Sequence, residues 1–304
     1  MFINFISLVL MMILSLLSVA FITLLERKVL GLIQIRKGPN KVGVYGVFQP
    51  FSDAIKLFTK ELMFPLKINL YPYWLSPVLA LFLSVFMWVV FPYVYIVLSW
   101  GNSVLFVFTV MSMTVYSIMI SGWFSNSCYS ILGAVRSIAQ SISYEVSFFL
   151  MILCLLYFIS SLNLTDFLKF QKFTWFIFFS FPVFFMFFVS FLAELNRTPF
   201  DFSEGESELV SGFNIEYGGS GFAFIFLAEY LSIIFASFFL VLVFLGGVVN
   251  YFFFLKLSFV SFYILLIRAS LPRYRYDKLM NMCWKSYLPS TLMLIVFYSS
   301  FISI

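Results

Sequence analysis

Histidine is absent from the 304-residue chain, and there are only three cysteines, Cys128, Cys154 and Cys283. Imidazole is a frequent metal and haem ligand and the usual base near neutral pH, so its absence excludes a histidine-based centre. The cysteines are too scattered for a C-x-x-C site or an iron–sulfur cradle. The phosphate-binding motifs G-x-x-x-x-G-K-[ST] and G-x-G-x-x-G are also missing. We therefore expect no metal, nucleotide or redox cofactor bound by this chain itself.

Charge is equally scarce, because charged residues make up 10% of the chain while hydrophobic residues make up 63% and include 45 phenylalanines. Soluble domains carry about 25% charged residues, and disordered chains are polar and highly charged. A soluble enzyme and a disordered protein are both excluded. The net charge of +5 does not indicate nucleic acid, since the basic residues lie in loops beside apolar runs. We expect a single transmembrane domain over residues 1–304.

What fills the chain is a series of apolar runs near the ~20 residues that a transmembrane helix needs. We predict eight spans, at residues 2–25, 73–98, 104–124, 137–160, 174–194, 222–245, 249–267 and 286–303. The first run lacks the basic start and cleavage site of a signal peptide, so it counts as a span. Residues 47–60 are too short and charged to span, but their apolar residues recur every three or four positions. The predicted fold is an all-α polytopic membrane protein with eight transmembrane helices and an amphipathic helix in the first loop.

Loop charges predict the orientation of these spans. Fifteen of the 18 basic residues lie in the odd-numbered loops and three in the even-numbered loops. The positive-inside rule places the odd loops, at about residues 26–72, 125–136, 195–221 and 268–285, on the matrix or cytoplasmic face. With eight spans, both termini then face the opposite side.

Four acidic residues lie in or at the ends of the apolar runs, where a charge costs roughly 2.5–3.5 kcal/mol at the bilayer centre. Glu145 lies inside the fourth predicted span and Glu229 inside the sixth, as is typical of ion or proton pathways. Glu26 ends the first span. Glu194 closes the fifth and precedes Arg197 by three residues, so the two could pair on one helical face. For Glu26 and Glu194, a structural ion pair or an interfacial position explains the charge equally well.

The fifth predicted loop, residues 195–221, is the most polar part of the chain. Seven of the 13 acidic residues fall between Glu194 and Glu229. A solvated acidic loop is the ordinary explanation. However, apolar residues alternate with the acids, namely Phe200, Phe202, Leu209, Val210 and Phe213. We therefore predict a packed, partly buried loop, in which some closely spaced acids hold protons or meet cations.

The first predicted loop is basic around the amphipathic stretch. Contact with lipid headgroups explains its lysines. It explains less well why Asp53 and Glu61 lie among them. This mixture of charges suggests docking against a protein partner.

Seven strings of residues carry a resemblance to a known family, at 26–28, 35–43, 46–61, 133–146, 193–217, 228–230 and 272–277. The longest begins Ala-Glu-Leu-Asn-Arg-Thr-Pro-Phe-Asp-Phe-Ser-Glu-Gly-Glu-Ser-Glu and continues to Tyr217. In order and spacing the chain resembles the subunit 1 family of respiratory NADH:ubiquinone oxidoreductase, complex I, over nearly its whole length. Two departures concern loop rigidity: Val44 stands where the family usually has proline, and residues 218–221 are unusually rich in glycine.

The resemblance implies eight spans and a core membrane subunit of a proton-pumping NADH:ubiquinone reductase, in which this chain alone is not catalytic. It implies that the chain forms the quinone-access cavity, docks the peripheral arm and couples quinone reduction to proton translocation. The implied partners are the hydrophilic quinone-site subunits, including the one with the terminal Fe–S cluster, and small and antiporter-like membrane subunits. Ubiquinone is the implied substrate, NADH, FMN and Fe–S clusters belong to partner subunits, and lipid such as cardiolipin is a further expected contact.

The residue chemistry supports these roles, because a Phe- and Met-rich cleft suits a quinone tail and charged groups suit its head. The candidates for the quinone-cavity wall are Arg27, Arg36, Phe226, Arg268, Arg273 and Arg275. The candidates for the proton path are Glu145, Glu194, Asp201, Glu204, Glu206, Glu208, Glu216 and Glu229, together with Glu26, Asp53 and Glu61. Structural or electrostatic roles are expected for Arg136, Tyr144, Arg197, Tyr217 and Tyr230, of which each tyrosine either extends a relay or packs.

Three alternatives remain open at this point. A homologous membrane subunit of a proton-pumping hydrogenase-type complex would share the fold and the acidic loop, and its partner subunits would distinguish it. A stand-alone proton or cation transporter would be active alone in proteoliposomes, although no inverted repeat is evident. A structural anchor would be insensitive to changes in its acids. The resemblance and the Phe-, Ile- and Met-rich composition predict the mitochondrial inner membrane, with both termini in the intermembrane space; a bacterial plasma membrane is the alternative.

Overall fold

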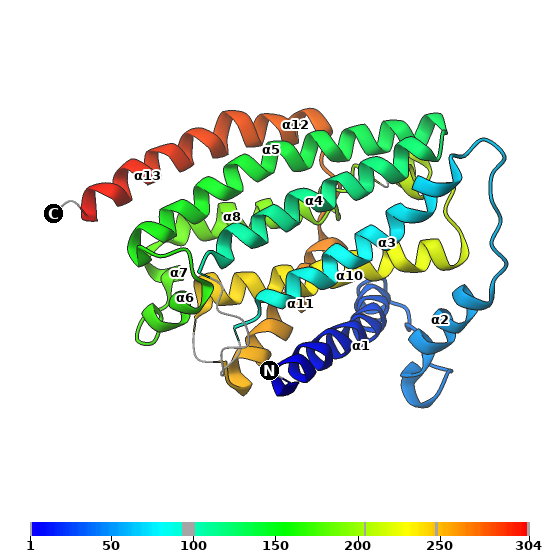
Figure 1. Cartoon of the computed structure of the whole chain (residues 1–304), viewed down its shortest axis with the longest axis horizontal. Coiled ribbons are helices and arrows are strands. Elements are labelled where there is room, and N and C mark those ends of the chain that lie inside the picture. Colours follow the sequence, from blue (N-terminus) through cyan, green and yellow to red (C-terminus); the bar gives the residue numbers. More distant parts are fainter. Residues whose placement is uncertain (1, 93–100, 204, 247–248, 303–304) are drawn as a thin grey trace.

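Helices of very different lengths pack side by side to form the molecule (Figure 1). The computed structural model describes residues 2–92, 101–203, 205–246 and 249–302, and within these ranges it contains no β-strand. Six of the described helices are long and apolar enough to cross a membrane: α1 (Phe2–Ile33), α3 (Leu70–Phe86), α4 (Ser103–Phe124), α5 (Cys128–Ile159), α10 (Gly219–Leu240) and α11 (Tyr251–Ser270). Helix suits such segments because lipid offers the backbone no hydrogen-bond partners. Short helical turns extend two of them, η2 (Met87–Val90) after α3 and η4 (Val241–Leu245) after α10.

The six long helices correspond to the first four predicted spans and to the sixth and seventh. The fifth predicted run is instead divided into α7 (Phe176–Phe179) and α8 (Phe181–Glu194). Pro182, at the start of α8, has no amide hydrogen for the preceding turn, which explains the break. The eighth run forms α13 (Leu288–Ile302), which continues from α12 (Tyr276–Asn281) and η5 (Met282–Tyr287). The count of eight spans therefore stays a prediction; residues 93–98 of the second and residue 303 of the eighth lie outside the described ranges.

Two boundaries predicted between helix and loop are wrong. Helix α1 continues to Ile33, so residues 26–33 of the first predicted loop are helical. Helix α5 begins at Cys128, so residues 128–136 of the third predicted loop are helical as well. The prediction ended each span at its first charges, but backbone hydrogen bonding continues beyond the apolar segment wherever the side chains permit a helix.

The remaining described helices are short and lie in the connections. They are α2 (Gln49–Thr59), α6 (Leu164–Phe170), α9 (Glu206–Leu209), η1 (Val44–Gly46) and η3 (Gly212–Asn214). Helix α2 falls within the predicted amphipathic stretch at 47–60 and packs against α1 and α10. Its Phe51 contacts Phe21 of α1, and its Phe58 contacts Phe224 of α10. The position of α2 at a membrane interface stays a prediction.

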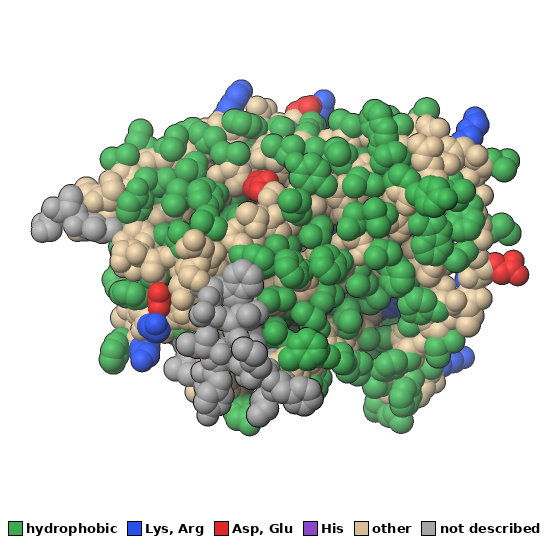
Figure 2. Space-filling model, in the orientation of Figure 1, with side chains coloured by type: hydrophobic (Ala, Val, Ile, Leu, Met, Phe, Trp, Pro, Cys, Tyr) green, Lys and Arg blue, Asp and Glu red, His purple; other side chains and the backbone are tan. Residues whose placement is uncertain are grey.

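The core lies where the long helices meet. Helix α3 packs against α4 and α10, and α5 packs against α4, α8 and α13. Phe148 of α5 stacks on Phe187 of α8 with ring centroids 4.3 Å apart, and Phe191 meets Phe148 edge-on at 4.7 Å. Aromatic pairs in these geometries add about 0.5–1.5 kcal/mol to the burial of their area. The outer face shown in Figure 2 is dominated by hydrophobic side chains, as expected of a protein solvated by lipid.

Candidate functional site: a carboxyl-lined pocket beside a buried charge cluster

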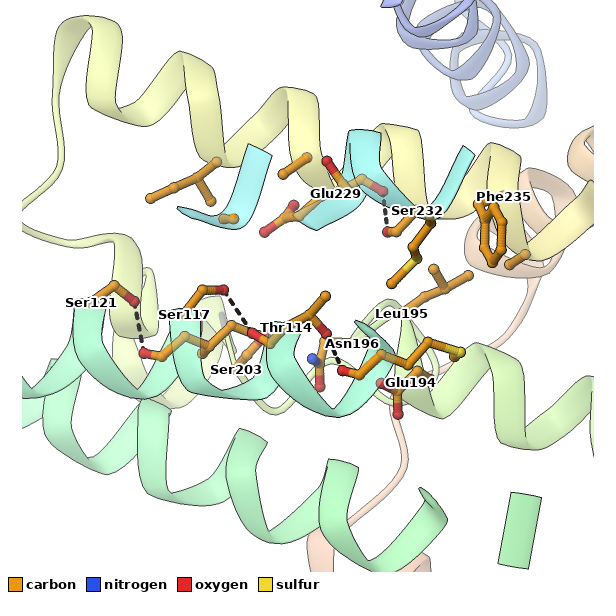
Figure 3. Close-up of a pocket in the computed structure, with 18 of the residues that line it drawn as sticks. Thr114, Ser117, Ser121, Glu194, Leu195, Asn196, Ser203, Glu229, Ser232 and Phe235 are labelled. Carbon is orange, nitrogen blue, oxygen red and sulfur yellow. Dashed lines mark hydrogen bonds between the residues drawn. The ribbon is translucent and has the colours of Figure 1, made fainter. Parts of the chain in front are cut away.

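A pocket with about 900 Å³ of empty space, counting its open mouth, lies between α3, α4, α10 and the end of α8. Much of its wall is apolar, and it includes Met87, Met111 and Phe191. Two carboxyl side chains line it from opposite walls, Glu194 at the end of α8 and Glu229 on α10 (Figure 3). The remaining polar lining consists of hydroxyl and amide side chains: Ser76, Ser84, Thr114, Ser117, Ser121, Asn196, Ser203 and Ser232. The site thus places two acids in an otherwise uncharged cavity.

The hydroxyls of this pocket were not identified from the sequence. Thr114, Ser117 and Ser121 are spaced by three and four residues and so share one face of α4. Each donates its hydrogen to the backbone carbonyl three residues earlier, at 2.6–2.7 Å, and Ser232 does the same on α10. The oxygen lone pairs then remain available to accept hydrogen bonds in the pocket. Hydroxyls at helical spacing within an apolar run are the sequence signal that could have identified this face.

Glu194 lies on the wall of the pocket that has no basic side chain beside its carboxyl group among the described ion pairs, in contrast to Glu229. It remains partly accessible because it faces the cavity, and Glu145 of α5 lies close enough for the two charges to interact. Neither carboxyl forms an ion pair within the described parts of the chain. The predicted pairing of Glu194 with Arg197 is wrong. Helix α8 ends at Glu194, so the three-residue spacing no longer puts the two side chains on one helical face.

Arg197 instead joins a buried charge cluster on the other side of the loop. Its Nη1 lies 3.2 Å from Oε2 of Glu26, near the C-terminal end of α1. Arg268 of α11 forms a second ion pair with Glu26. Glu26 is 3% exposed and Arg197 is 8% exposed, so this pair is shielded from solvent. Burial of an ion pair is tolerable only when the charges are mutually compensated, and Glu26 meets that condition with two guanidinium groups.

The cluster continues from Arg197 to α10. Arg197 Nη2 lies 3.7 Å from Oε2 of Glu229, and its guanidinium carbon lies 4.2 Å from the centroid of the Tyr230 ring. An arginine over the face of a tyrosine ring gains a favourable cation–π contact. Glu26, Arg197, Glu229 and Tyr230 were each singled out from the sequence, and the structure brings them together from three separate segments.

The acidic loop after α8 is packed, as predicted. Phe200, Phe202, Leu209 and Phe213 are buried, whereas Val210 is exposed. Phe200 and Phe202 belong to the main core and Phe213 to a smaller buried cluster, so apolar burial helps to hold the loop. A solvated acidic loop is therefore not what the fold contains.

The acids of this loop have different surroundings. Glu208 forms an ion pair with Arg136 at 2.5 Å, and both side chains are substantially exposed. The hydrogen bond from Arg136 lowers the pKa of Glu208 below its ordinary value. Asp201 is partly buried, and its Oδ1 accepts a hydrogen bond from the amide of Gly205 at 3.5 Å. Glu204 and the side chain of Glu206 lie outside the described residues.

One face of α5 holds this loop in place, and sequence reasoning missed both residues that do so. The buried Gln140 donates two hydrogen bonds from Nε2, to the carbonyls of Ala193 at 2.7 Å and Phe200 at 3.0 Å. About two helical turns before Gln140, Gly133 lies very near the loop. A Cβ atom added at Gly133 would sit 3.0 Å from the carbonyl oxygen of Ser203. Gly133 and Gln140 are seven residues apart, which places them on the same helical face.

The candidates in the first loop lie away from the pocket. Arg27 at the end of α1 pairs with Asp53 of α2, whose other oxygen accepts a hydrogen bond from Gln49. The two helices are thus joined by charge as well as by aromatic contacts. Arg36 and Glu61 are both exposed. Part of the mixed charge that suggested a protein partner is therefore satisfied within the chain.

The other quinone-wall candidates are also outside the lining of the pocket. Arg273 lies over the ring of Phe202 at 5.1 Å, beside the acidic loop. Arg275 forms an exposed ion pair with Asp277 at 2.9 Å. Phe226 packs against Tyr230 with ring centroids 4.9 Å apart. Their place in a quinone-cavity wall stays a prediction.

The remaining candidates have packing partners. Tyr144 is buried and donates a hydrogen bond to the carbonyl of Leu279 at 3.3 Å. Tyr217 stacks on Tyr73 at 4.3 Å, and its hydroxyl donates a hydrogen bond to the backbone carbonyl of Tyr73 at 3.2 Å. Tyr73 donates to the carbonyl of Glu216, whose side chain is partly exposed. Among the described residues, no group of acidic or cysteine side chains has the arrangement needed to hold a metal ion.

Fold and site together define a class: a helical membrane protein with several spans, whose interior holds ionisable side chains around a polar pocket. The family model described as NADH dehydrogenase matches residues 6–299, and the chain belongs to this family. The chain is similar to NADH-ubiquinone oxidoreductase chain 1 of Locusta migratoria, with 55% identity over 290 residues that cover 95% of this chain and 92% of the relative. The same protein of Anopheles gambiae is 54% identical over 282 residues, which cover 92% and 90% of the two chains. That of Artemia franciscana is 50% identical over 292 residues, which cover 96% of both. The resemblance inferred from the motifs is confirmed.

Proposed function

We propose that this chain is a core membrane subunit of a proton-pumping NADH:ubiquinone oxidoreductase and that its pocket is part of the path along which protons move. Membership of the NADH dehydrogenase family and the names of its relatives support the first part. The observation that carries the second part is the pair of carboxyls, Glu194 and Glu229, facing each other across a pocket inside an apolar bundle.

The wall formed by Glu194 supplies the exchangeable site in this proposal. A carboxylate removed from water and without a cation is costly, so such a group is stable mainly as the neutral acid. Glu145 is near enough that ionisation of both acids would be opposed by their repulsion. One proton shared between Glu145 and Glu194 is therefore the favourable arrangement, and gain or loss of that proton is the chemical step we assign to them.

The hydroxyl face of α4 extends this site along the pocket. Thr114, Ser117 and Ser121 present acceptor oxygens in a row, and each hydroxyl hydrogen can leave its backbone partner by rotation. Ordered water between such groups makes hydrogen bonds nearly as favourable as direct ones. We propose that water and hydroxyls together connect Glu194 with Glu229.

The partners follow from what the chain lacks and from where its charges lie. NADH oxidation requires FMN and Fe–S clusters, which we assign to hydrophilic partner subunits docked on the first and fifth loops. Ubiquinone is the proposed substrate, approaching the end of the bundle where Arg27, Arg268 and Arg273 lie. Small and antiporter-like membrane subunits, and lipid such as cardiolipin, are the proposed neighbours of the apolar faces. We place the complex in the mitochondrial inner membrane, with eight spans, α2 at the interface and both termini in the intermembrane space.

The direct test of the proton path is Glu194→Gln, with Glu145→Gln as its companion, in the intact complex. Both substitutions keep the shape and remove the exchangeable proton. We expect normal assembly, and loss of most proton translocation coupled to NADH oxidation, measured in reconstituted vesicles. Asp166→Asn is the matched control, because Asp166 lies in α6, pairs with Lys169 and is far from the pocket lining. Unchanged proton translocation in assembled Glu145→Gln and Glu194→Gln complexes would contradict the proposal.

A separate experiment tests the quinone assignment. A photoreactive quinone analogue should label this chain in the intact complex, and peptides from the segments around Arg27 or Arg273 should carry the label. Labelling confined to other subunits would count against a quinone contact here, and would leave the proton path untouched.

A further inference from the structure

Arg197 occupies a position between two carboxylates that belong to different parts of the molecule. Its Nη1 lies 3.2 Å and 3.3 Å from the two oxygens of Glu26 on α1, and its Nη2 lies 3.7 Å from Glu229 on α10. A guanidinium group is planar and presents donors on two separate nitrogens, so it can serve both acids at once. A lysine ammonium at the same place would be a single point charge.

The charges around Arg197 are balanced in a particular way. Glu26 already has a second cation, Arg268 of α11. Two acids, Glu26 and Glu229, thus meet two arginines, and the group is neutral when both acids are ionised. Protonation of Glu229 would leave the group with a net positive charge in a buried site, which is unfavourable. The arrangement therefore favours the ionised form of Glu229.

Glu229 is also the point at which this cluster reaches the pocket. Its side chain is 25% exposed and lines the cavity opposite Glu194 (Figure 3), whereas Glu26 and Arg197 are buried and do not line the cavity. A change in the position of the Arg197 guanidinium therefore changes the electrostatic field at the Glu229 carboxyl group on the pocket wall.

The other end of the cluster is connected to the first loop. Glu26 is followed directly by Arg27, which pairs with Asp53 of α2. A displacement of α2 or of the end of α1 would move Glu26, and the guanidinium would follow Glu26 or shift towards Glu229. Two ion pairs, Asp53 with Arg27 and Glu26 with Arg197, are therefore linked through adjacent residues of the α1 backbone.

We propose that Arg197 is a positioning residue that is shared between Glu26 and Glu229 and holds Glu229 ionised at the pocket wall, so that a shift of α1 and α2 changes the proton affinity of the pocket. This inference rests on the proposed function of the pocket. It assigns to Arg197 control over one acid of the path, and it makes Glu26 a fixed anion that seats the guanidinium and is not itself a carrier.

The test uses infrared difference spectroscopy on the intact complex carrying Arg197→Gln. An opposite charge within about 4–6 Å changes a carboxyl protonation equilibrium by about tenfold or more. We expect a new carboxylic-acid band near neutral pH, which disappears in the double variant Arg197→Gln/Glu229→Gln. Lys169→Gln, which removes the exposed Lys169–Asp166 pair, is the matched control and should give no such band.

The infrared result decides the inference. The absence of a new band, or a band that persists in the double variant, would overturn it. If Arg197→Gln does not assemble, Arg197→Lys replaces it, and a smaller band of the same assignment is expected because the ammonium cannot bridge both acids. Proton translocation measured on the same samples separates the two proposals. A band without any change in translocation supports the role of Arg197 and contradicts the proton path, whereas reduced translocation without a band contradicts the role of Arg197.

Discussion

Glu229 and Glu194 line the same pocket, but they differ in what lies behind them. Glu229 is backed by Arg197, which is held in turn by Glu26 and Arg268. Glu194 has another acid, Glu145, within electrostatic range, and no ion-pair partner among the described residues. Two glutamate side chains on facing walls of one pocket thus have neighbours of opposite charge. The difference is that one acid of the pocket faces a cation and the other faces a second acid, and on this basis we propose an ionised Glu229 and an exchangeable proton at Glu194.

The largest effect should come from breaking the charged wall at Glu26. Glu26→Gln removes the anion that the buried Arg197 and the partly exposed Arg268 share, and removing one partner of a buried pair costs roughly 3–5 kcal/mol. We expect a lower yield of assembled complex and a lower unfolding temperature, measured by native electrophoresis and thermal denaturation. The comparison would fail if Glu26→Gln behaved like Glu194→Gln, which removes no ion pair in the described structure and should leave stability unchanged.

An intermediate effect is expected from Gln140, which holds the wall of Glu194 without any charge. Gln140→Leu removes one donor from each of the buried carbonyls of Ala193 and Phe200, which keep the amides of Asn196 and Phe202, at a cost of roughly 0.5–1.5 kcal/mol for each lost hydrogen bond. The loop that follows Glu194 should exchange its amide hydrogens faster, as measured by mass spectrometry. Gln34→Leu, at an exposed position of the first loop, is the matched control. Equal rates of amide hydrogen exchange in the two variants would show that Gln140 does not hold the loop.

The smallest effect is expected from the exposed pair of Arg136 and Glu208, which contributes about 0–1 kcal/mol as surface pairs do. Arg136 lowers the pKa of Glu208, so the folded value lies below the unfolded one. The contribution is present above the ordinary glutamate pKa and is lost as the pH falls through the lowered value. Arg136→Gln should therefore lower the unfolding temperature slightly at neutral pH, with a difference that shrinks towards about pH 4. A difference that is constant over this range would exclude the ion pair as its cause.

The helices of the bundle were largely predictable, because apolar runs near twenty residues have few other structures in lipid. Their ends were not, as α1 and α5 show, since charged residues continue a helix beyond its apolar part. The break before α8 depends on Pro182, whose effect the hydropathy pattern hides. Local sequence could therefore indicate which segments are helical but not where each helix ends.

The candidate site was predictable in its residues and not in its contacts. Glu26, Arg197, Glu229 and Tyr230 all lie in the recognised motifs, yet Arg197 and Glu26 are 171 residues apart in sequence. No local spacing indicates such a pair, and the one spacing that did suggest a partner, from Glu194 to Arg197, was misleading. Gln140 was missed because a lone amide in a polar-rich helical segment gives no signal until its two carbonyl partners are placed beside it.

The protonation of the two pocket acids in the intact complex is the most direct test of the account. Infrared spectra of complex containing isotope-labelled glutamate, assigned with Glu194→Gln and Glu229→Gln, report each carboxyl separately. Near neutral pH the account predicts a carboxylic-acid band that is lost in Glu194→Gln, and only a carboxylate signal for Glu229. A carboxylic-acid band that belongs to Glu229, with Glu194 ionised, would contradict it.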